Sequence, residues 1–156
     1  MLRRLEAYQS VVPLLLRLGV GLTFFFAGLS KVMGGTAGVA GFFGKLGIPL
    51  PAVMGPFISY LELLGGLALI LGLLTRVFGL LFICDMLVAI LAAKLPAAMA
   101  AKNIADGWPQ LRAELMLLVG SASLAILGAG LFSVDAALLG EKPSEYEEPV
   151  RARTTA

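Results

Sequence analysis

Residues 57–75 read FISYLELLGGLALILGLLT, an almost uniformly apolar stretch that contains one acidic residue, Glu62. Its length is close to the ~20 residues with which an α-helix crosses the hydrocarbon core of a bilayer. Similar stretches occur at residues 11–30, 77–93 and 113–132. We therefore predict an all-α integral membrane protein, a bundle of four transmembrane helices arranged as antiparallel hairpins.

The composition of the whole chain agrees with a lipid environment. Hydrophobic residues make up 59% of its 156 residues and the mean hydropathy is +0.94, whereas soluble domains are about 45–50% apolar. A net charge of +2 with dispersed charges gives no sign of nucleic-acid binding. We predict one four-span domain over residues 1–140, in contact with the lipid bilayer, and a disordered polar tail over residues 141–156.

Two residue types limit the chemistry that the chain can support. It has no histidine, so haem, zinc or copper sites built on histidine and acid–base catalysis by imidazole are excluded. It has one cysteine, Cys84, which excludes an intramolecular disulfide and a Cys-x-x-Cys redox pair. No metal site is predicted.

Each predicted span contains an ionisable residue, and such a group at bilayer depth costs ~2.5–3.5 kcal/mol even on insertion scales. Arg17 and Asp85 are predicted to be level, at depths of ~9 and ~12 Å, and to pair. Lys31, at the end of the first span, faces the same way as Arg17 and can reach Glu62 and Glu114. These five charges either hold the bundle in register or line a polar cavity for a ligand or a proton. Glu62 is the strongest functional candidate.

The segments between the spans carry fewer signals. Residues 34–56 are rich in glycine yet apolar, and are predicted to be an interfacial connector or a lid over a cavity, with a helix near residues 39–46. A tight turn is expected at residues 73–77. Within the first span, Gly19, Thr23 and Ala27 recur every four residues, which predicts a face for helix packing.

An even number of spans places both termini on one side of the membrane. Six basic residues accompany the termini and five lie opposite, a small bias toward termini in the cytoplasm. The hydrophilic tail is also easier to leave inside than to translocate. We predict that both termini are cytoplasmic.

Several short motifs, taken in order, resemble the DoxX family over residues 11–136. They are Arg17-Leu18-Gly19, Phe26-Ala27-Gly28-Leu29-Ser30-Lys31, Gly47-Ile48-Pro49, Glu62-Leu63-Leu64-Gly65-Gly66, Leu71-Gly72-Leu73-Leu74-Thr75-Arg76, Gly107-Trp108, Glu114 and Gly128-Ala129-Gly130-Leu131-Phe132-Ser133-Val134-Asp135. The resemblance implies a small four-helix protein of the bacterial or archaeal cytoplasmic membrane. It also implies that Arg17, Lys31, Glu62 and Glu114 occupy recurring charged positions of the family.

Some relatives are subunits of thiosulfate:quinone oxidoreductases, and others are linked to membrane-associated oxidoreductase complexes. The resemblance therefore implies a quinone as the candidate cofactor and other membrane or redox proteins as partners. Many members carry a histidine in the third span or at its exit, which this chain lacks, so ligand chemistry that needs histidine is in doubt here.

Three functions remain open from the sequence. The first is a redox-associated subunit that binds a quinone-like or sulfur-containing molecule in a charged cavity. The second is a scaffold or assembly subunit without catalysis, and the third is a carrier of small solutes. The sequence decides neither between them nor whether the protein forms a homo-oligomer.

Overall fold

The computed structural model describes residues 11–130 and 132–139, without the side chain of Ile104. The elements are helices, with no strand in these ranges. In chain order they are α2 (Val12–Met33), α3 (Thr36–Lys45), α4 (Pro51–Leu71), α5 (Thr75–Ala89), the π-helical segment η2 (Ile90–Lys94), α6 (Leu95–Met99), α7 (Ile104–Leu127) and α8 (Val134–Leu139). The tail predicted to be disordered, residues 141–156, lies outside the described residues.

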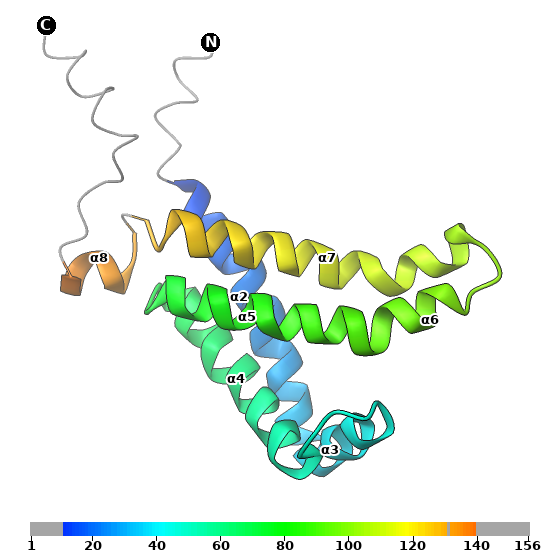
Figure 1. Cartoon of the computed structure of the whole chain (residues 1–156). Coiled ribbons are helices and arrows are strands. Elements are labelled where there is room, and N and C mark those ends of the chain that lie inside the picture. The colour runs from blue at the N-terminus through cyan, green and yellow to red at the C-terminus, as the bar shows by residue number, and fades with distance from the viewer. Residues whose placement is uncertain (1–10, 131, 140–156) are drawn as a thin grey trace, which may run out of the picture.

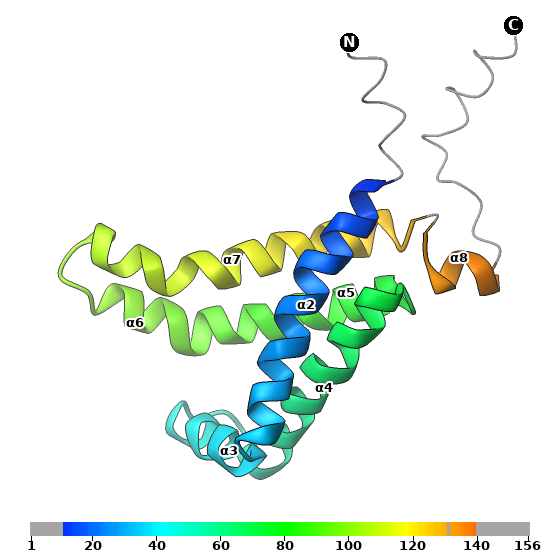
Figure 2. The ribbon, with the colours of Figure 1, turned by 180° about the vertical axis from the view of Figure 1, so that it is seen from behind.

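The long helices form two arms (Figures 1 and 2). The first arm is α2 packed antiparallel against α4. The second is a continuous rod of α5, η2 and α6 that runs beside α7. The arms meet at a closed end, where α2 begins and α7 ends, and diverge toward an open end, where α3 and α6 lie.

Four segments are long and apolar enough to cross a membrane. They are Val12–Met33, Pro51–Leu71, Thr75–Met99 and Ala105–Leu127. The predicted all-α membrane fold with four apolar helices is confirmed.

The helix ends differ from the hydropathy-based spans because local chemistry sets them. α4 begins at Pro51, six residues before the predicted start, because proline is well suited to a first helical turn. α7 begins near Asn103, whose side chain accepts a hydrogen bond from the Asp106 N–H at 3.0 Å. It ends at Gly128, whose φ of 80° turns the chain out of the helix before residue 132.

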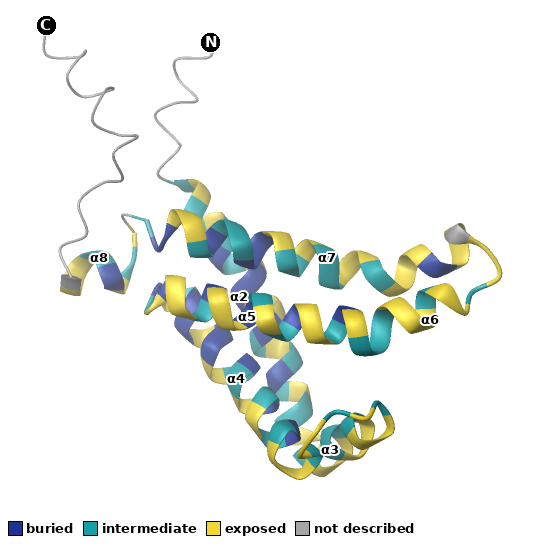
Figure 3. Ribbon diagram, viewed as in Figure 1, coloured by how far each residue is buried: buried dark blue, intermediate teal, exposed yellow. Residues whose placement is uncertain are grey.

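The connection at the closed end of the first arm is a short turn, whereas the connection at its open end contains a helix. The α4–α5 turn occupies residues 72–74, with Gly72 and Leu74 both in the left-handed region. At the open end, the helix expected near residues 39–46 is α3, which begins at Thr36 after Gly35, a residue at φ 90°. α3 has no buried residue (Figure 3).

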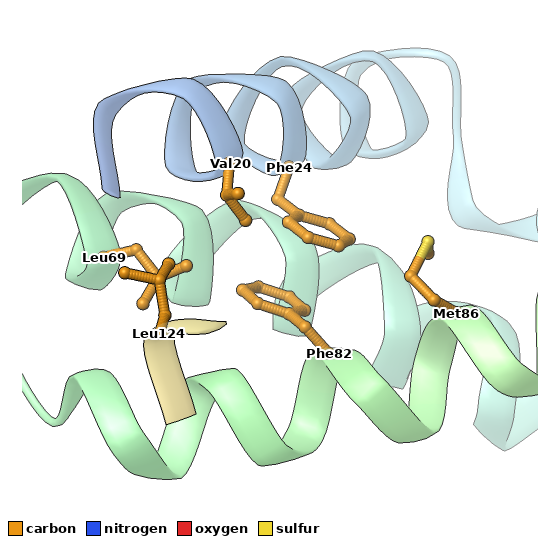
Figure 4. Close-up of a cluster of buried hydrophobic side chains, with 6 residues drawn as sticks. All are labelled: Val20, Phe24, Leu69, Phe82, Met86 and Leu124. Atoms are coloured by element: carbon orange, nitrogen blue, oxygen red, sulfur yellow. The ribbon is translucent and has the colours of Figure 1, made fainter. Parts of the chain in front are cut away.

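A compact apolar cluster joins the arms near the closed end (Figure 4). Phe24 of α2 stacks on Phe82 of α5, with ring centroids 3.7 Å apart and planes at 3°. The other members are Val20, Leu69, Met86 and Leu124. In lipid, close van der Waals packing of this kind is a main source of helix association.

Glycines let the two helices of the first arm touch through their backbones. A Cβ built on Gly28 would lie 2.7 Å from the Cα of Leu63, and one on Gly21 would lie 2.9 Å from the carbonyl oxygen of Gly66. The face predicted to pack is different, because Gly19 is exposed and, among the described residues, nothing lies within 4 Å of a Cβ placed there. Thr23 and Ala27, from the same predicted stripe, line a cavity instead.

Candidate functional site

A cavity of about 710 Å³ lies between the two arms. Helices α2, α3, α4, α5 and α7 and the segment η2 all contribute to its wall. Most of the lining is apolar and includes four phenylalanines: Phe24, Phe42, Phe43 and Phe57. Five charged residues also line it: Lys31, Glu62, Asp85, Lys94 and Glu114. The cavity is therefore an apolar space with a small number of charged groups in its wall.

The first ion pair in the wall joins α2 to α4. The Lys31 ammonium donates a hydrogen bond to Oε2 of Glu62. The backbone contact at Gly28 explains this geometry, because it brings α2 against Glu62 and Leu63 one turn before Lys31. Only 4% of the Glu62 side chain is exposed, against 33% for Lys31. The carboxylate is thus fixed in the interior, while the lysine stem extends from a more open position.

Asp85 belongs to α5 in the second arm, and its carboxyl lies beside that of Glu62 and within electrostatic reach of Lys31. Its Oδ2 atom is buried and has no hydrogen-bond partner among the described residues. Two carboxyl groups from different arms thus face one ammonium group. A buried carboxylate oxygen without a donor is costly, so this is the least satisfied part of the wall.

The second ion pair, between Lys94 and Glu114, lies within the second arm. Its Nζ–Oε1 distance is 2.8 Å. Lys94 ends the π-helical segment η2, and Pro96 follows two residues later. Proline has no N–H to donate to the carbonyl four residues before it, and its ring crowds that carbonyl, which favours a widened turn here. π-bulges of this kind often occur at functional sites.

Lys94 is not among the charged residues that the sequence predicts for the site. Glu114 was expected to meet Lys31, but its ion-pair partner among the described residues is Lys94. The signal that could have indicated Lys94 was Pro96, which lies three residues beyond the predicted third span and disturbs the helix that continues there.

Arg17 does not belong to the cavity. It is 1% exposed and lies at the closed end, where its Nη2 donates a hydrogen bond to the carbonyl oxygen of Phe132. The predicted Arg17–Asp85 pair is wrong. Both α2 and α5 begin at the closed end, and Asp85 lies about 15 Å along α5 whereas Arg17 lies only about 8 Å along α2. The Arg17 guanidinium is packed against the α4–α5 turn at Gly72.

Asp135 is a second residue that the candidate set lacked. Its carboxylate accepts hydrogen bonds from the N–H groups of Leu74 at 2.8 Å and Thr75 at 3.0 Å. It therefore caps the N-terminus of α5 from α8, a contact between distant parts of the chain that anchors the closed end. Arg17 is within electrostatic reach of it. The signal for Asp135 was an acidic residue just beyond the last apolar stretch.

A family model described as DoxX matches residues 12–95, from the start of α2 to the first residue of α6. The chain belongs to the DoxX family. A relative from Bacillus subtilis (strain 168), named "Putative oxidoreductase CatD", is 37% identical over 126 residues, which cover 81% of this chain and 86% of the relative. No solved structure matches the chain significantly.

A second relative is named "Uncharacterized membrane protein Rv3486" and comes from Mycobacterium tuberculosis (strain ATCC 25618 / H37Rv). It is 32% identical over 138 residues, which cover 85% of each chain. The DoxX match contains four of the five charged residues of the cavity wall: Lys31, Glu62, Asp85 and Lys94. Glu114 and the capping residue Asp135 lie beyond it.

Proposed function

We propose that this DoxX-family protein is a membrane subunit associated with oxidoreduction, and that it binds a small quinone-like molecule between its arms. The observation that carries the proposal is an apolar cavity of about 710 Å³ whose wall contains the Lys31–Glu62 ion pair. Small-molecule sites typically measure about 300–1,000 Å³ and combine an apolar lining with a few polar groups that orient the ligand.

A quinone head group has the chemistry that this wall can hold. Its planar ring can pack against phenylalanine side chains such as Phe42, Phe43 and Phe57, which line the cavity. Its carbonyl oxygens accept hydrogen bonds, and Lys31 is an ammonium donor in the wall. The charge on that donor would make the hydrogen bond stronger than one between neutral groups.

The association with oxidoreduction has support in the printed name of the Bacillus subtilis relative. The electrons are proposed to come from a partner protein, because this chain has no histidine and only one cysteine for haem or iron–sulfur ligation. The protein's part is to hold the quinone-like molecule in the membrane while that partner reduces or oxidises it.

The proposal includes a location and a topology. The protein is placed in a bacterial cytoplasmic membrane, with residues 1–140 as one four-span domain and both termini on the cytoplasmic side. The closed end of the two arms then lies toward the cytoplasm. The cavity and α3 lie toward the opposite face.

Quinone binding can be measured on the purified full-length protein in lipid nanodiscs. Mass spectrometry of a solvent extract should detect a co-purified quinone. Calorimetric titration with decylubiquinone should give saturable binding. Glu62→Gln should weaken that binding about tenfold or more, because Lys31 loses the carboxylate on α4 that holds its ammonium in place.

Tyr60→Phe is the matched control for this substitution. Tyr60 is on α4, two residues from Glu62, but it is exposed and outside the cavity lining. Its binding should equal that of the unmodified protein. If no quinone is extracted and decylubiquinone does not bind, or if Glu62→Gln binds as well as Tyr60→Phe, the proposal fails and a scaffold role becomes the better hypothesis.

A further inference from the structure

The charges in the cavity wall do not balance. The lining contains three carboxyl groups, of Glu62, Asp85 and Glu114, and two ammonium groups, of Lys31 and Lys94. Each ammonium is within ion-pair distance of a glutamate. Asp85 is the carboxyl left without an ion-pair partner of its own among the described residues.

Among the described residues, the cavity wall offers Asp85 no cation that is free of another carboxylate. The ionisable lining groups that surround it are Lys31 from α2, Glu62 from α4, Cys84 from α5 itself, Lys94 from η2 and Glu114 from α7. Helix α3 contributes only glycine and apolar side chains to the lining. The Lys31 ammonium is therefore the cation that Glu62 and Asp85 have to share, since Lys94 is held by Glu114 at 2.8 Å.

Two ionised carboxylates side by side repel each other strongly in a medium of low dielectric constant. One ammonium can neutralise one of them, and the other is stable only when it carries a proton. A neutral carboxyl group can also donate its proton in a hydrogen bond to the neighbouring carboxylate. This arrangement satisfies an oxygen that is otherwise buried without a partner.

We propose that Glu62 and Asp85 hold one proton between them, and that this carboxyl pair is the proton-binding site of the cavity. This inference rests on the proposed function for the identity of the ligand, and it adds that the ligand's head group should carry hydrogen-bond acceptors. The shared proton leaves the pair with one negative charge, which Lys31 neutralises, so a molecule bound beside the pair meets the Lys31 ammonium as a hydrogen-bond donor and no net negative charge. The site thus favours a head group with acceptor oxygens, such as a quinone carbonyl, over a cationic head group.

Infrared spectroscopy of the full-length protein in nanodiscs, with no quinone added, tests the proton directly. A protonated carboxyl group has a C=O stretching band, distinct from the carboxylate bands, that shifts in D₂O. The unmodified protein should show this band at neutral pH. Asp85→Asn and Glu62→Gln should each abolish it, because the remaining carboxyl can ionise beside Lys31. Asp106→Asn, at an exposed position outside the cavity, should leave it unchanged.

A third variant keeps the proposal testable if the other substitutions prevent folding. Lys31→Met removes the shared cation, so both carboxyls should become neutral and the band should grow about twofold. The proposal is overturned if the unmodified protein shows no such band, or if the band persists in both Asp85→Asn and Glu62→Gln. Decylubiquinone binding with no band would overturn this inference alone, and a band without quinone binding would overturn the proposed function alone.

Discussion

Replacing Gly28 by alanine should separate the two helices of the first arm. A Cβ at this position would lie 2.7 Å from the Cα of Leu63 and 2.8 Å from the carbonyl carbon of Glu62. Both are backbone atoms of α4 and cannot rotate away. Carbon atoms pack comfortably at about 3.5–4.0 Å, so the helices have to move apart locally by about 1 Å.

The size of the effect follows from comparison with Gly19→Ala on the same helix. At Gly19 no described atom lies within 4 Å of the added methyl group, and alanine should stabilise the helix by up to about 1 kcal/mol. Overpacking of an interior contact typically costs about 1–3 kcal/mol. We therefore expect Gly28→Ala to be less stable than Gly19→Ala by about 1–3 kcal/mol, since the gain in helix propensity is common to both.

Reversible unfolding in mixed detergent micelles, followed by circular dichroism, measures the free energy of unfolding of both variants. Decylubiquinone binding should also weaken in Gly28→Ala, because the shift displaces Glu62 relative to Lys31. If Gly28→Ala is as stable as Gly19→Ala, the backbone contact between α2 and α4 does not exist as described, and the explanation of the Lys31–Glu62 geometry fails with it.

Two other predictions concern the closed end and the topology. Arg17→Leu should lower the free energy of unfolding by about 1–3 kcal/mol, because it removes the charged hydrogen bond to the carbonyl oxygen of Phe132 and the cation near the buried Asp135 carboxylate. The double variant Arg17→Leu/Asp135→Asn should lose about 0.5–3 kcal/mol less free energy of unfolding than the sum of the two single variants. Additive losses in the same unfolding assay would refute the coupling between the two residues. For topology, a membrane-impermeant thiol reagent should label Arg76→Cys from the cytoplasm and Gly38→Cys from outside, in a Cys84→Ala background; cytoplasmic labelling of residue 38 would refute the proposed orientation.

The four apolar helices were predictable because hydropathy and length alone define them. Their ends were not, because caps and turns set them. Asn103 starts α7 well before the apolar part of the fourth span, and Gly128 ends it early. The packing face of α2 was also misidentified. The four-residue spacing of Gly19, Thr23 and Ala27 describes one face of a helix, but spacing does not say which face a neighbouring helix covers.

The sequence predicts most of the charged residues that line the cavity, but it predicts their ion-pair partners only in part. Helical rise along the chain predicts Lys31 within reach of Glu62, and the two form an ion pair in the structure. The predicted Arg17–Asp85 pair assumed that the helix axes are parallel, because only then do equal residue counts from the helix ends place two side chains at the same depth. The arms instead diverge, so Asp85 lies on the cavity wall while Arg17 belongs to the closed end. Lys94 faces Glu114 through a π-helical turn, which regular helix periodicity does not predict.

The divergence of the arms links the packing at the closed end to the geometry of the cavity. At the closed end, the hydrogen bond from Arg17 of α2 to the carbonyl oxygen of Phe132 and the stacking of Phe24 on Phe82 hold the second arm against the first. Toward the open end, the same two arms separate and leave the space that Lys31, Glu62 and Asp85 line. The distance between Glu62 on α4 and Asp85 on α5 is therefore set by contacts made elsewhere in the helices that carry them. A change at the closed end that alters the angle between the arms should change how the two carboxyl groups share a proton, even though it touches neither of them.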